Sequence, residues 1–220
     1  MVRTYKGKRI GLMGLSANPP HDGHVAMARY AKDMLGLDEV WWVVANQNPN
    51  KSKRDMAPFE DRYEWSCIMA ADHDWLKVTD FEKREGVSRS FDMLTKMKAQ
   101  NPNDKFVWII GDDNLKTFHT WYKWQDIMAL VPIAVMARAK SLKNILSSPA
   151  AKHAQDITID TPEDLIHLTR GLTILDNPLV PIKSTDLRDA FRSGRGQISG
   201  THPEIIRQVK QKGSYGRPSR

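Results

Sequence analysis

Two histidines, His21 and His24, stand in a turn rich in proline and glycine, between a short apolar run and an amphipathic helix. The turn reads PPHDGH over residues 19–24. Asp22 is expected to be the helix N-cap, so that Gly23 and His24 fall in the first turn, where backbone N–H groups lack helical partners. Such a helix start attracts anions. Imidazoles at positions 21 and 24 would add donors that can carry positive charge, which favours a polyphosphate ligand.

Other interpretations of this turn find less support in the surrounding sequence. An isolated pair of histidines at this spacing is commonly two unrelated surface or core residues. A zinc pair would need a third ligand, and the lone cysteine, Cys67, lies far away. No Gly-Lys-Ser/Thr follows, as it would in a Walker loop, and the glycines at 11 and 14 lack the G-x-G start of a dinucleotide fingerprint.

A second helix start near the C-terminus offers matching chemistry. It reads KSTDLR over residues 183–188. Ser184 is expected to cap the helix, its neighbours to present N–H groups, and Arg188 to lie one turn further on. A guanidinium suits a polyphosphate because it donates two hydrogen bonds side by side and stays charged. Standing alone, the stretch would indicate an ordinary capped surface helix.

These two stretches carry a resemblance to a known group of enzymes. They resemble the H-x-G-H and S-T-x-x-R signatures of the nucleotidyltransferase superfamily. The run IGDDNL at 110–115, followed by FHTW at 118–121, is similar to the I-G-x-D-x-L…F-x-x-W run of bacterial nicotinate-mononucleotide adenylyltransferases. Shorter matches extend the resemblance over nearly the whole chain except about 138–170, and include residues 47–51, 59–62, 88–94 and 213–215.

The resemblance implies adenylyl transfer from ATP to the 5′-phosphate of nicotinate mononucleotide, giving nicotinate adenine dinucleotide and pyrophosphate. The nucleophile is an ionised phosphate, so catalysis would consist of alignment and stabilisation of charge, without a general base. His21, His24 and Arg188 are the expected catalytic residues. Mg²⁺ would accompany ATP through phosphate oxygens and water, and no metal ligand is expected from the protein.

The same resemblance assigns binding residues. ATP is expected to contact Gly14, Ser16, His21, His24, Lys51, Gly111, Asp113, Ser184, Thr185 and Arg188. The pyridine mononucleotide is expected to contact Asn18, Asn46, Ser90 and Trp121. Trp121 would stack on the cationic pyridine ring, and Asp113 would accept hydrogen bonds from ribose hydroxyls, with Gly111 allowing the sugar to approach.

Three residues depart from the family's pattern. Leu15 stands for a glycine and Ala17 for a phenylalanine in the start G-G-[ST]-F-[DN]-P, which changes the floor under the phosphates. Arg89 stands where tyrosine is common, beside the pyridine pocket. An added arginine favours a carboxylate, and therefore the nicotinate form of the substrate.

The elements that must position these residues alternate between apolar runs and helical patterns. Strands are expected at 9–14, 39–45, 76–80, 105–110, 132–137 and 172–176, and helices at 22–35, 59–71, 88–99, 121–130, 162–169, from 184 and at 203–212. This order predicts an α/β fold, a Rossmann-like doubly wound parallel sheet with helices on both faces and C-terminal helices. Ligands then bind at the carboxyl ends of the strands.

The remaining organisation is simple. Residues 138–170 are weakly periodic and are treated as a variable segment, with a helix at 141–147 and a loop near Pro149. There are no repeats and no interdomain linker, so residues 1–220 are expected to form one nucleotidyltransferase domain that ends in a basic tail at 213–220.

The amino-acid composition limits the classes of binding partner that are expected. The 33 basic and 26 acidic residues give a net charge of +7, and much of the excess lies at the two ends of the chain. No nucleic-acid recognition motif accompanies it, so phosphorylated small molecules are expected rather than nucleic acid. One cysteine and the lack of a long apolar run predict a cytoplasmic protein without a membrane partner.

Several alternatives stay open at this point. The acceptor could be nicotinamide mononucleotide or another phosphorylated molecule of the phosphopantetheine type, or the reaction could be a cytidylyl transfer. Because Leu15 and Ala17 alter the phosphate floor, a non-catalytic nucleotide-binding or nucleic-acid-binding protein with the same fold is also open. A homodimer is the expected oligomer, if one forms.

Overall fold

The computed structural model describes residues 7–46, 56–137, 142–176, 180–194 and 198–216, and contains a six-stranded parallel sheet. The strands are β1 (Arg9–Leu15), β2 (Glu39–Val44), β3 (Leu76–Thr79), β4 (Lys105–Gly111), β5 (Ile133–Ala137) and β6 (Leu172–Asp176). Their order is β3-β2-β1-β4-β5-β6, and every neighbouring pair is parallel. The order reverses between β1 and β4, where a sheet of this kind opens a crevice for a ligand. Met13 of β1 pairs with Ile109 of β4, so these two strands end level with each other.

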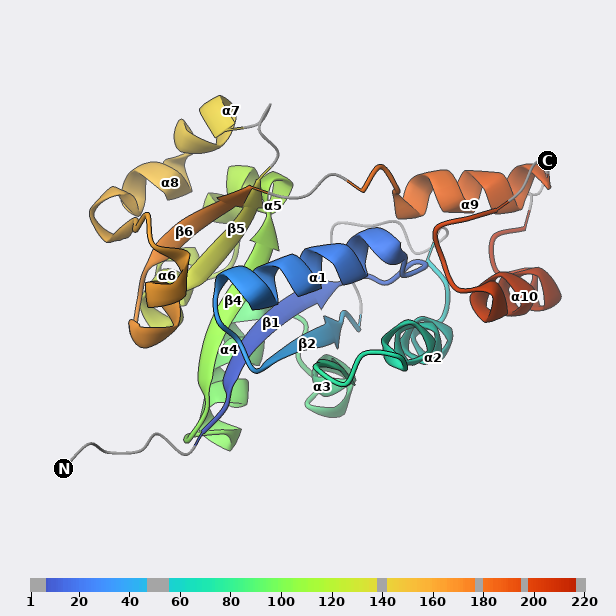
Figure 1. Ribbon diagram of the computed structural model, residues 1–220, viewed down its shortest axis with the longest axis horizontal. Coiled ribbons are helices and arrows are strands. Elements are labelled where there is room, and N and C mark those ends of the chain that lie inside the picture. Colours follow the sequence, from blue (N-terminus) through green and yellow to red (C-terminus); the bar gives the residue numbers. More distant parts are fainter. Residues whose placement is uncertain (1–6, 47–55, 138–141, 177–179, 195–197, 217–220) are drawn as a thin grey trace.

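Helices cover both faces of the sheet (Figure 1). One face carries α1 (Asp22–Met34), α2 (Phe59–Ala70), η5 (Pro162–His167) and α10 (Pro203–Lys212). The other carries α3 (Phe81–Arg84), α4 (Ser90–Gln100), α5 (Asp112–Thr117), η2 (Phe118–Thr120), α6 (Trp124–Leu130), α7 (Leu142–Leu146) and α8 (Pro149–His153). A short η4 (Gln155–Ile157) follows α8, and α9 (Ser184–Ser193) precedes α10. In Figure 1, α9 and α10 lie at one end of the molecule and α7 and α8 at the other.

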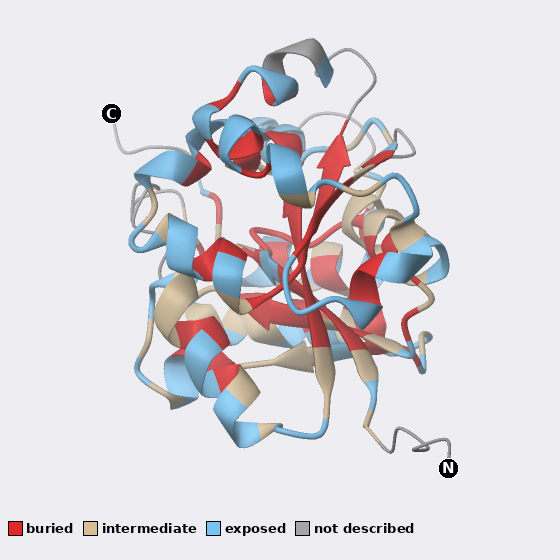
Figure 2. Cartoon of the chain, turned by 90° about the vertical axis from the view of Figure 1, so that its left-hand side faces the viewer, coloured by how far each residue is buried: buried red, intermediate tan, exposed pale blue. Residues whose placement is uncertain are grey.

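The strands are buried on both sides because their residues alternate between two apolar cores. In β4, Val107 and Ile109 join the core under α1 and α2, whereas Phe106, Trp108 and Ile110 join the core under α4 and α6. Figure 2 shows the strands buried along most of their length, with exposed residues gathered on the outer surfaces of helices. Continuous apolar strands of this kind are typical of parallel sheets covered on both faces.

The predicted α/β architecture is confirmed, and most boundaries agree within two residues. The helix predicted at 121–130 begins instead at Trp124, because Lys123 adopts a left-handed conformation with φ of +53°. The helix predicted at 88–99 begins at Ser90. The expected loop near Pro149 is wrong: this proline opens α8, where the Ser148 hydroxyl accepts a hydrogen bond from the backbone N–H of Ala151.

Two further differences concern short elements. Residues 162–167 form a 3₁₀ helix rather than an α-helix, and α3 and α5 were not predicted as separate helices. The helix expected at 141–147 is present as α7, although residue 141 lies outside the described residues. Among the described helices, none has the length and apolar character needed to span a bilayer.

Candidate active site

The turn between β1 and α1 places two imidazole rings in contact. His21 is the N-cap of α1, with φ of −154°, and Asp22 is the first helical residue, so the predicted cap was one position too late. The backbone N–H of His24 donates to the carbonyl of His21 at 2.8 Å, and the N–H of His21 donates to Nδ1 of His24 at 3.1 Å. Because Nδ1 of His24 is an acceptor, the neutral ring carries its proton on Nε2. The two ring centroids lie 3.7 Å apart in a stacked arrangement.

His21 is held almost out of solvent, with 7% of its surface exposed. Burial lowers the pKa of its imidazole to about 4, although the charge of Asp186 acts in the opposite direction. Its Nδ1 is buried and has no hydrogen-bond partner in the described part of the chain. A Cβ atom at Gly23 would lie 3.0 Å from this ring, which explains why a glycine separates Asp22 from His24.

The C-terminal signature contacts this turn directly. The Ser184 hydroxyl donates to the carbonyl of Pro19 at 2.9 Å, and Nη1 of Arg188 donates to the carbonyl of Asn18 at 2.8 Å. The Thr201 hydroxyl donates to the carbonyl of Pro20 at 2.9 Å. We call Ser184, Arg188 and Thr201 the C-terminal clasp, since they bind three consecutive carbonyls of the turn.

The start of α9 differs from the prediction in one respect. Lys183 is its N-cap and Ser184 is the first helical residue, and no side-chain cap is present. The Ser184 hydroxyl is therefore used between segments rather than within its helix. In the described residues, Nε of Arg188 is buried without a hydrogen-bond partner, and Nη2 reaches the Thr185 hydroxyl at 3.4 Å.

Asn18 has an internal role that its sequence position did not indicate. It is 4% exposed, and its Oδ1 accepts hydrogen bonds from the N–H of Ala57 at 3.0 Å and the hydroxyl of Tyr215 at 2.8 Å. A contact between Asn18 and the substrate stays a prediction. The peptide bond between Asn18 and Pro19 is cis, and Ala17 before it has φ of +50°.

Two buried charged residues near the ends of β1 and β2 escaped the sequence analysis as functional residues. Arg62 of α2 is 1% exposed and donates to the carbonyls of Ser16, Ala45, Asn46 and Ala57. The carboxylate of Glu82 in α3 accepts from the backbone N–H of Asn46 at 3.0 Å. Burial raises the pKa of Glu82 to about 7, against the opposing effects of that hydrogen bond and of the Arg62 charge.

A signal for one of them was present in the sequence. Arg62 stands three residues before Trp65 and seven before Met69, on the buried stripe of α2, so a charged side chain there needs internal partners. Glu82 gave no such signal, because α3 has a single turn and no readable period.

The two family departures in the turn lie on the core side. Leu15 is 8% exposed and Ala17 is 1% exposed, and both belong to the core under α1 and α2. Gly14 faces the opposite way, where a Cβ would lie 2.8 Å from the indole ring of Trp108. The substitutions therefore change core packing beneath the turn.

The end of β4 adds an acidic group at the same edge of the sheet as the end of β1. Gly111 ends the strand, and a Cβ there would lie 2.6 Å from Oδ1 of Asp113. The carboxylate of Asp113, an exposed residue, therefore lies against Gly111, and the approach of a ribose at Gly111 stays a prediction. Asp112 is buried and its Oδ1 accepts the N–H of Asp113 at 2.9 Å.

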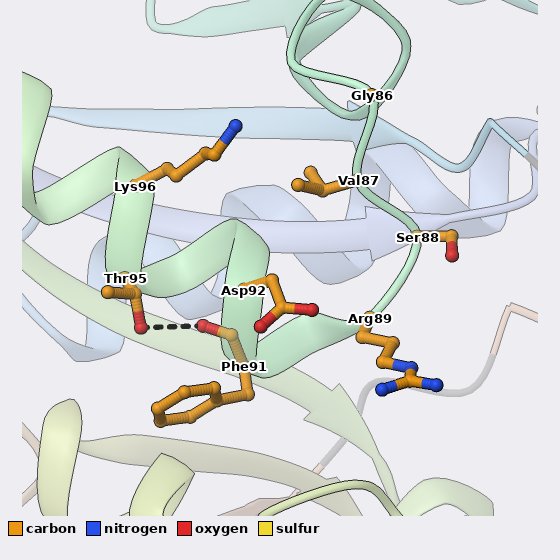
Figure 3. A pocket seen from close by; sticks show the side chains of 8 residues that line it. All are labelled: Gly86, Val87, Ser88, Arg89, Phe91, Asp92, Thr95 and Lys96. Carbon is orange, nitrogen blue, oxygen red and sulfur yellow. Dashed lines mark hydrogen bonds between the residues drawn. The ribbon is translucent and has the colours of Figure 1, made fainter.

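Of the residues expected at the pyridine end, Arg89 and Ser90 lie at the start of α4, and Trp121 precedes Tyr122, whose ring contacts Arg89. A cavity of about 410 Å³ lies between residues 86–89 and the first turns of α4, and Figure 3 shows its lining side chains. The Arg89 guanidinium in its wall lies 4.4 Å from the ring centroid of Tyr122. Trp121, next to Tyr122, is half-buried with its ring 5.0 Å from that of Phe118. Ser90 is the first residue of α4.

The structure brings some of the predicted site residues into one cluster and places others elsewhere. Hydrogen bonds or ring contacts link His21, His24, Asn18, Ser184 and Arg188 in one cluster. Asn46 is exposed at the end of β2, where its backbone binds Arg62 and Glu82. Lys51 lies outside the described residues.

A parallel sheet with this strand order, and with two helix starts meeting at one loop, defines a nucleotide-binding α/β class. The family model described as cytidylyltransferase-like matches residues 12–190, so the chain belongs to that family.

Proteins of similar sequence narrow the assignment within this family. A protein of Agrobacterium fabrum named probable nicotinate-nucleotide adenylyltransferase is 45% identical over 151 residues, covering 69% of this chain and 80% of that protein. A protein of the same name from Rhizobium etli is 39% identical, covering 84% of this chain and 97% of that protein. Within its family, the chain belongs with the nicotinate-nucleotide adenylyltransferases.

Solved structures share the fold at low sequence identity. The Plasmodium falciparum nicotinic acid mononucleotide adenylyltransferase complexed with APC matches with a TM-score of 0.70 and 16% identity, covering 94% of this chain and 97% of that one. The structure of that protein complexed with NaAD matches with the same TM-score and 17% identity.

Proposed function

We propose that this chain transfers the adenylyl group of ATP to the 5′-phosphate of nicotinate mononucleotide. The observation that carries the proposal is the hydrogen-bonded junction between the His21–His24 turn and the start of α9, at the carboxyl end of β1. Two helix starts that meet at the switch point of the sheet favour a polyphosphate ligand. The names of relatives at 39–45% identity support the same reaction.

The proposed chemistry needs donors for charge that grows on phosphate oxygens. Nε2–H of His24 would donate to the α-phosphate, with His21 beside it. Nε of Arg188 would donate to the β- and γ-phosphates, because Nη1 is already bonded to the carbonyl of Asn18. The Ser184 hydroxyl already donates to Pro19, so its part is to fix the turn, while the backbone N–H groups of α9 face the anion.

The acceptor would lie toward Trp121 and the start of α4. Trp121 offers its indole to the pyridine ring, Asp113 offers its carboxylate to ribose hydroxyls, and Arg89 offers a cation to the nicotinate carboxylate. The groups around the turn are hydrogen-bond donors to phosphate rather than metal ligands. Mg²⁺ would therefore be held by the triphosphate and water, as is common for this ion.

Pyrophosphate release from ATP and Mg²⁺ tests the proposal, with nicotinate mononucleotide, nicotinamide mononucleotide and phosphopantetheine as parallel acceptors. Release is expected with nicotinate mononucleotide at a rate well above that with the amide. Comparable rates with both pyridine nucleotides would show that Arg89 does not select the carboxylate. Release only with phosphopantetheine, or with no acceptor, would contradict the proposed function.

Three further features belong to this proposal. We infer that the chain acts as one nucleotidyltransferase domain in the cytoplasm, which its single cysteine supports. We also infer small-molecule partners alone, without nucleic acid or membrane. A homodimer stays a prediction, and sedimentation of the purified chain tests it.

A further inference from the structure

The chain returns to the phosphate-binding turn after α10. Gly213 ends that helix in the left-handed region with φ of +61°, which redirects the chain. Tyr215 follows and is 5% exposed. Its ring centroid lies 5.9 Å from that of Phe191 in α9 and 6.1 Å from that of Trp65 in α2. The phenol ring is therefore held between two helices.

The Tyr215 hydroxyl and the Arg188 guanidinium meet on the same residue of the turn. Tyr215 donates to the side-chain oxygen of Asn18 at 2.8 Å, and Arg188 donates to the backbone oxygen of Asn18 at 2.8 Å. Both bonds depend on the position of one residue, so a shift of the Asn18 side chain also moves the anchor of Arg188. Burial raises the pKa of Tyr215 well above its usual range, so the phenol keeps its proton and continues to donate.

The bond to Asn18 is the short anchor of the guanidinium. The contact of Nη2 with the Thr185 hydroxyl is long, at 3.4 Å, and Nε has no hydrogen-bond partner among the described residues. Orientation of Nε therefore depends on the Nη1 bond.

We propose that Tyr215 is a positioning residue that acts through Asn18 to orient Arg188 for the triphosphate of ATP. This inference rests on the proposed function only in assigning Arg188 to ATP. Tyr215 itself touches no substrate. Removal of its hydroxyl should therefore weaken the ATP side of the site and spare the pyridine side.

Tyr215→Phe tests the inference, because it removes one oxygen and keeps the ring between Phe191 and Trp65. The Kd for a non-hydrolysable ATP analogue with Mg²⁺, measured by titration calorimetry, is expected to rise about tenfold. The KM for ATP should rise by a similar factor, with the KM for nicotinate mononucleotide unchanged. Asn18→Ala breaks the same link from its other end and should raise the same Kd. In an Arg188→Lys background, Tyr215→Phe should add no further loss.

Gln208→Ala is the matched control in α10. Gln208 accepts from Nε1 of Trp65 at 2.9 Å and donates to Glu64 at 2.8 Å, so its removal loosens α10 on α2 without touching Asn18. This variant should lower Tm and leave the Kd for the analogue at the wild-type value.

The possible results separate the role of Tyr215 from the proposed function. An unchanged Kd in Tyr215→Phe, or equal weakening of ATP and pyridine nucleotide, would overturn the positioning role. If the wild type binds the analogue but releases no pyrophosphate with any acceptor, adenylyl transfer is wrong while the Kd comparison still decides the role of Tyr215. A wild type that does not bind the analogue would overturn both.

Discussion

The stacked imidazoles of His21 and His24 show how a single residue's setting fixes its charge. His21 is buried and stacks on a second ring at 3.7 Å, so its charged, protonated form is poorly solvated. Burial therefore lowers the pKa of His21. In the free protein His21 is therefore neutral at physiological pH. Its Nδ1 has no hydrogen-bond partner in the part of the chain that the structure describes, so it can take up a proton when an anion lies beside the ring.

Bound ATP should raise the pKa of His21. The free protein should show an imidazole that titrates near pH 4, and phosphate oxygens beside it should stabilise the protonated ring and move the titration upward. Proton NMR of the His21 ring across pH, with and without a non-hydrolysable ATP analogue, measures both values. A titration that ignores the analogue would place the triphosphate elsewhere.

His24→Ala should lower turnover by roughly two to three orders of magnitude, the scale of losing one preorganised donor to a reacting oxyanion. Pyrophosphate release at saturating substrates measures this loss. His167→Ala, an exposed histidine at the end of η5, is the control and should match the wild type. Near-wild-type turnover in His24→Ala would remove this imidazole from the mechanism.

At the scale of elements, Arg62 joins three segments at the carboxyl ends of β1 and β2. Its guanidinium binds carbonyls from the turn after β1, from the residue after β2 and from Ala57, two residues before α2. The charged guanidinium is almost fully buried, so it needs these internal acceptors. The residue thus fixes the end of β1, the end of β2 and the start of α2 relative to one another.

Arg62→Met should lower the free energy of unfolding by about 3 kcal/mol or more, because the carbonyls of Ser16, Ala45, Asn46 and Ala57 lose their donor at once. Urea denaturation measures this change. Arg84→Met, which removes an exposed ion pair with Asp80 on α3, should cost less than about 1 kcal/mol. Equal effects of the two variants would show that the carbonyls around Arg62 find other partners.

Helices and strands with a regular pattern of apolar residues could be predicted from the sequence. Hydrogen bonds between segments far apart in the chain could not. The apolar runs of β2 and β4 and the regular stripe of α10 appeared in the sequence because many residues repeat the same signal. The starts of α1 and α9 were misplaced by one residue. In α1 the side chain of His24 accepts from the N–H of His21, which makes His21 the cap, and in α9 the Ser184 hydroxyl bonds to another segment instead of capping its own helix. Tyr215 and Arg62 matched the family's spacing, but their carbonyl and amide partners lie too far along the chain for local patterns to show.

At the scale of the whole molecule, two buried groups make stability depend on pH in opposite directions. The pKa of Glu82 is raised from 4.5 to about 7, so its contribution is fully present below pH 4.5 and is lost as the pH rises through 7. The pKa of His21 is lowered from 6.5 to about 4, so its contribution is present above pH 6.5 and is lost as the pH falls through 4.

Glu82→Gln should therefore gain stability relative to the wild type as the pH rises. Glutamine keeps an oxygen for the N–H of Asn46 and carries no charge to bury. The difference in unfolding free energy should be small near pH 4.5 and approach about 3 kcal/mol above pH 7. Thermal unfolding from pH 5 to pH 8 measures it, with the surface variant Glu163→Gln as control. A constant gap between Glu82→Gln and the wild type would mean that Glu82 does not take up a proton on folding.

The C-terminal clasp has a consequence for how the protein is made. Its three hydrogen bonds join residues 165, 170 and 181 positions apart in the chain. A ribosome releases the strands, α1 and both histidines before it releases Ser184, Arg188 and Thr201. Most of the sheet can therefore form on the growing chain, while the carbonyls of the turn wait for partners not yet synthesised. We expect a nascent chain stopped before α9 to fold in its centre but to lack the clasp, so the nucleotide site should become complete only after residues 184–201 are made.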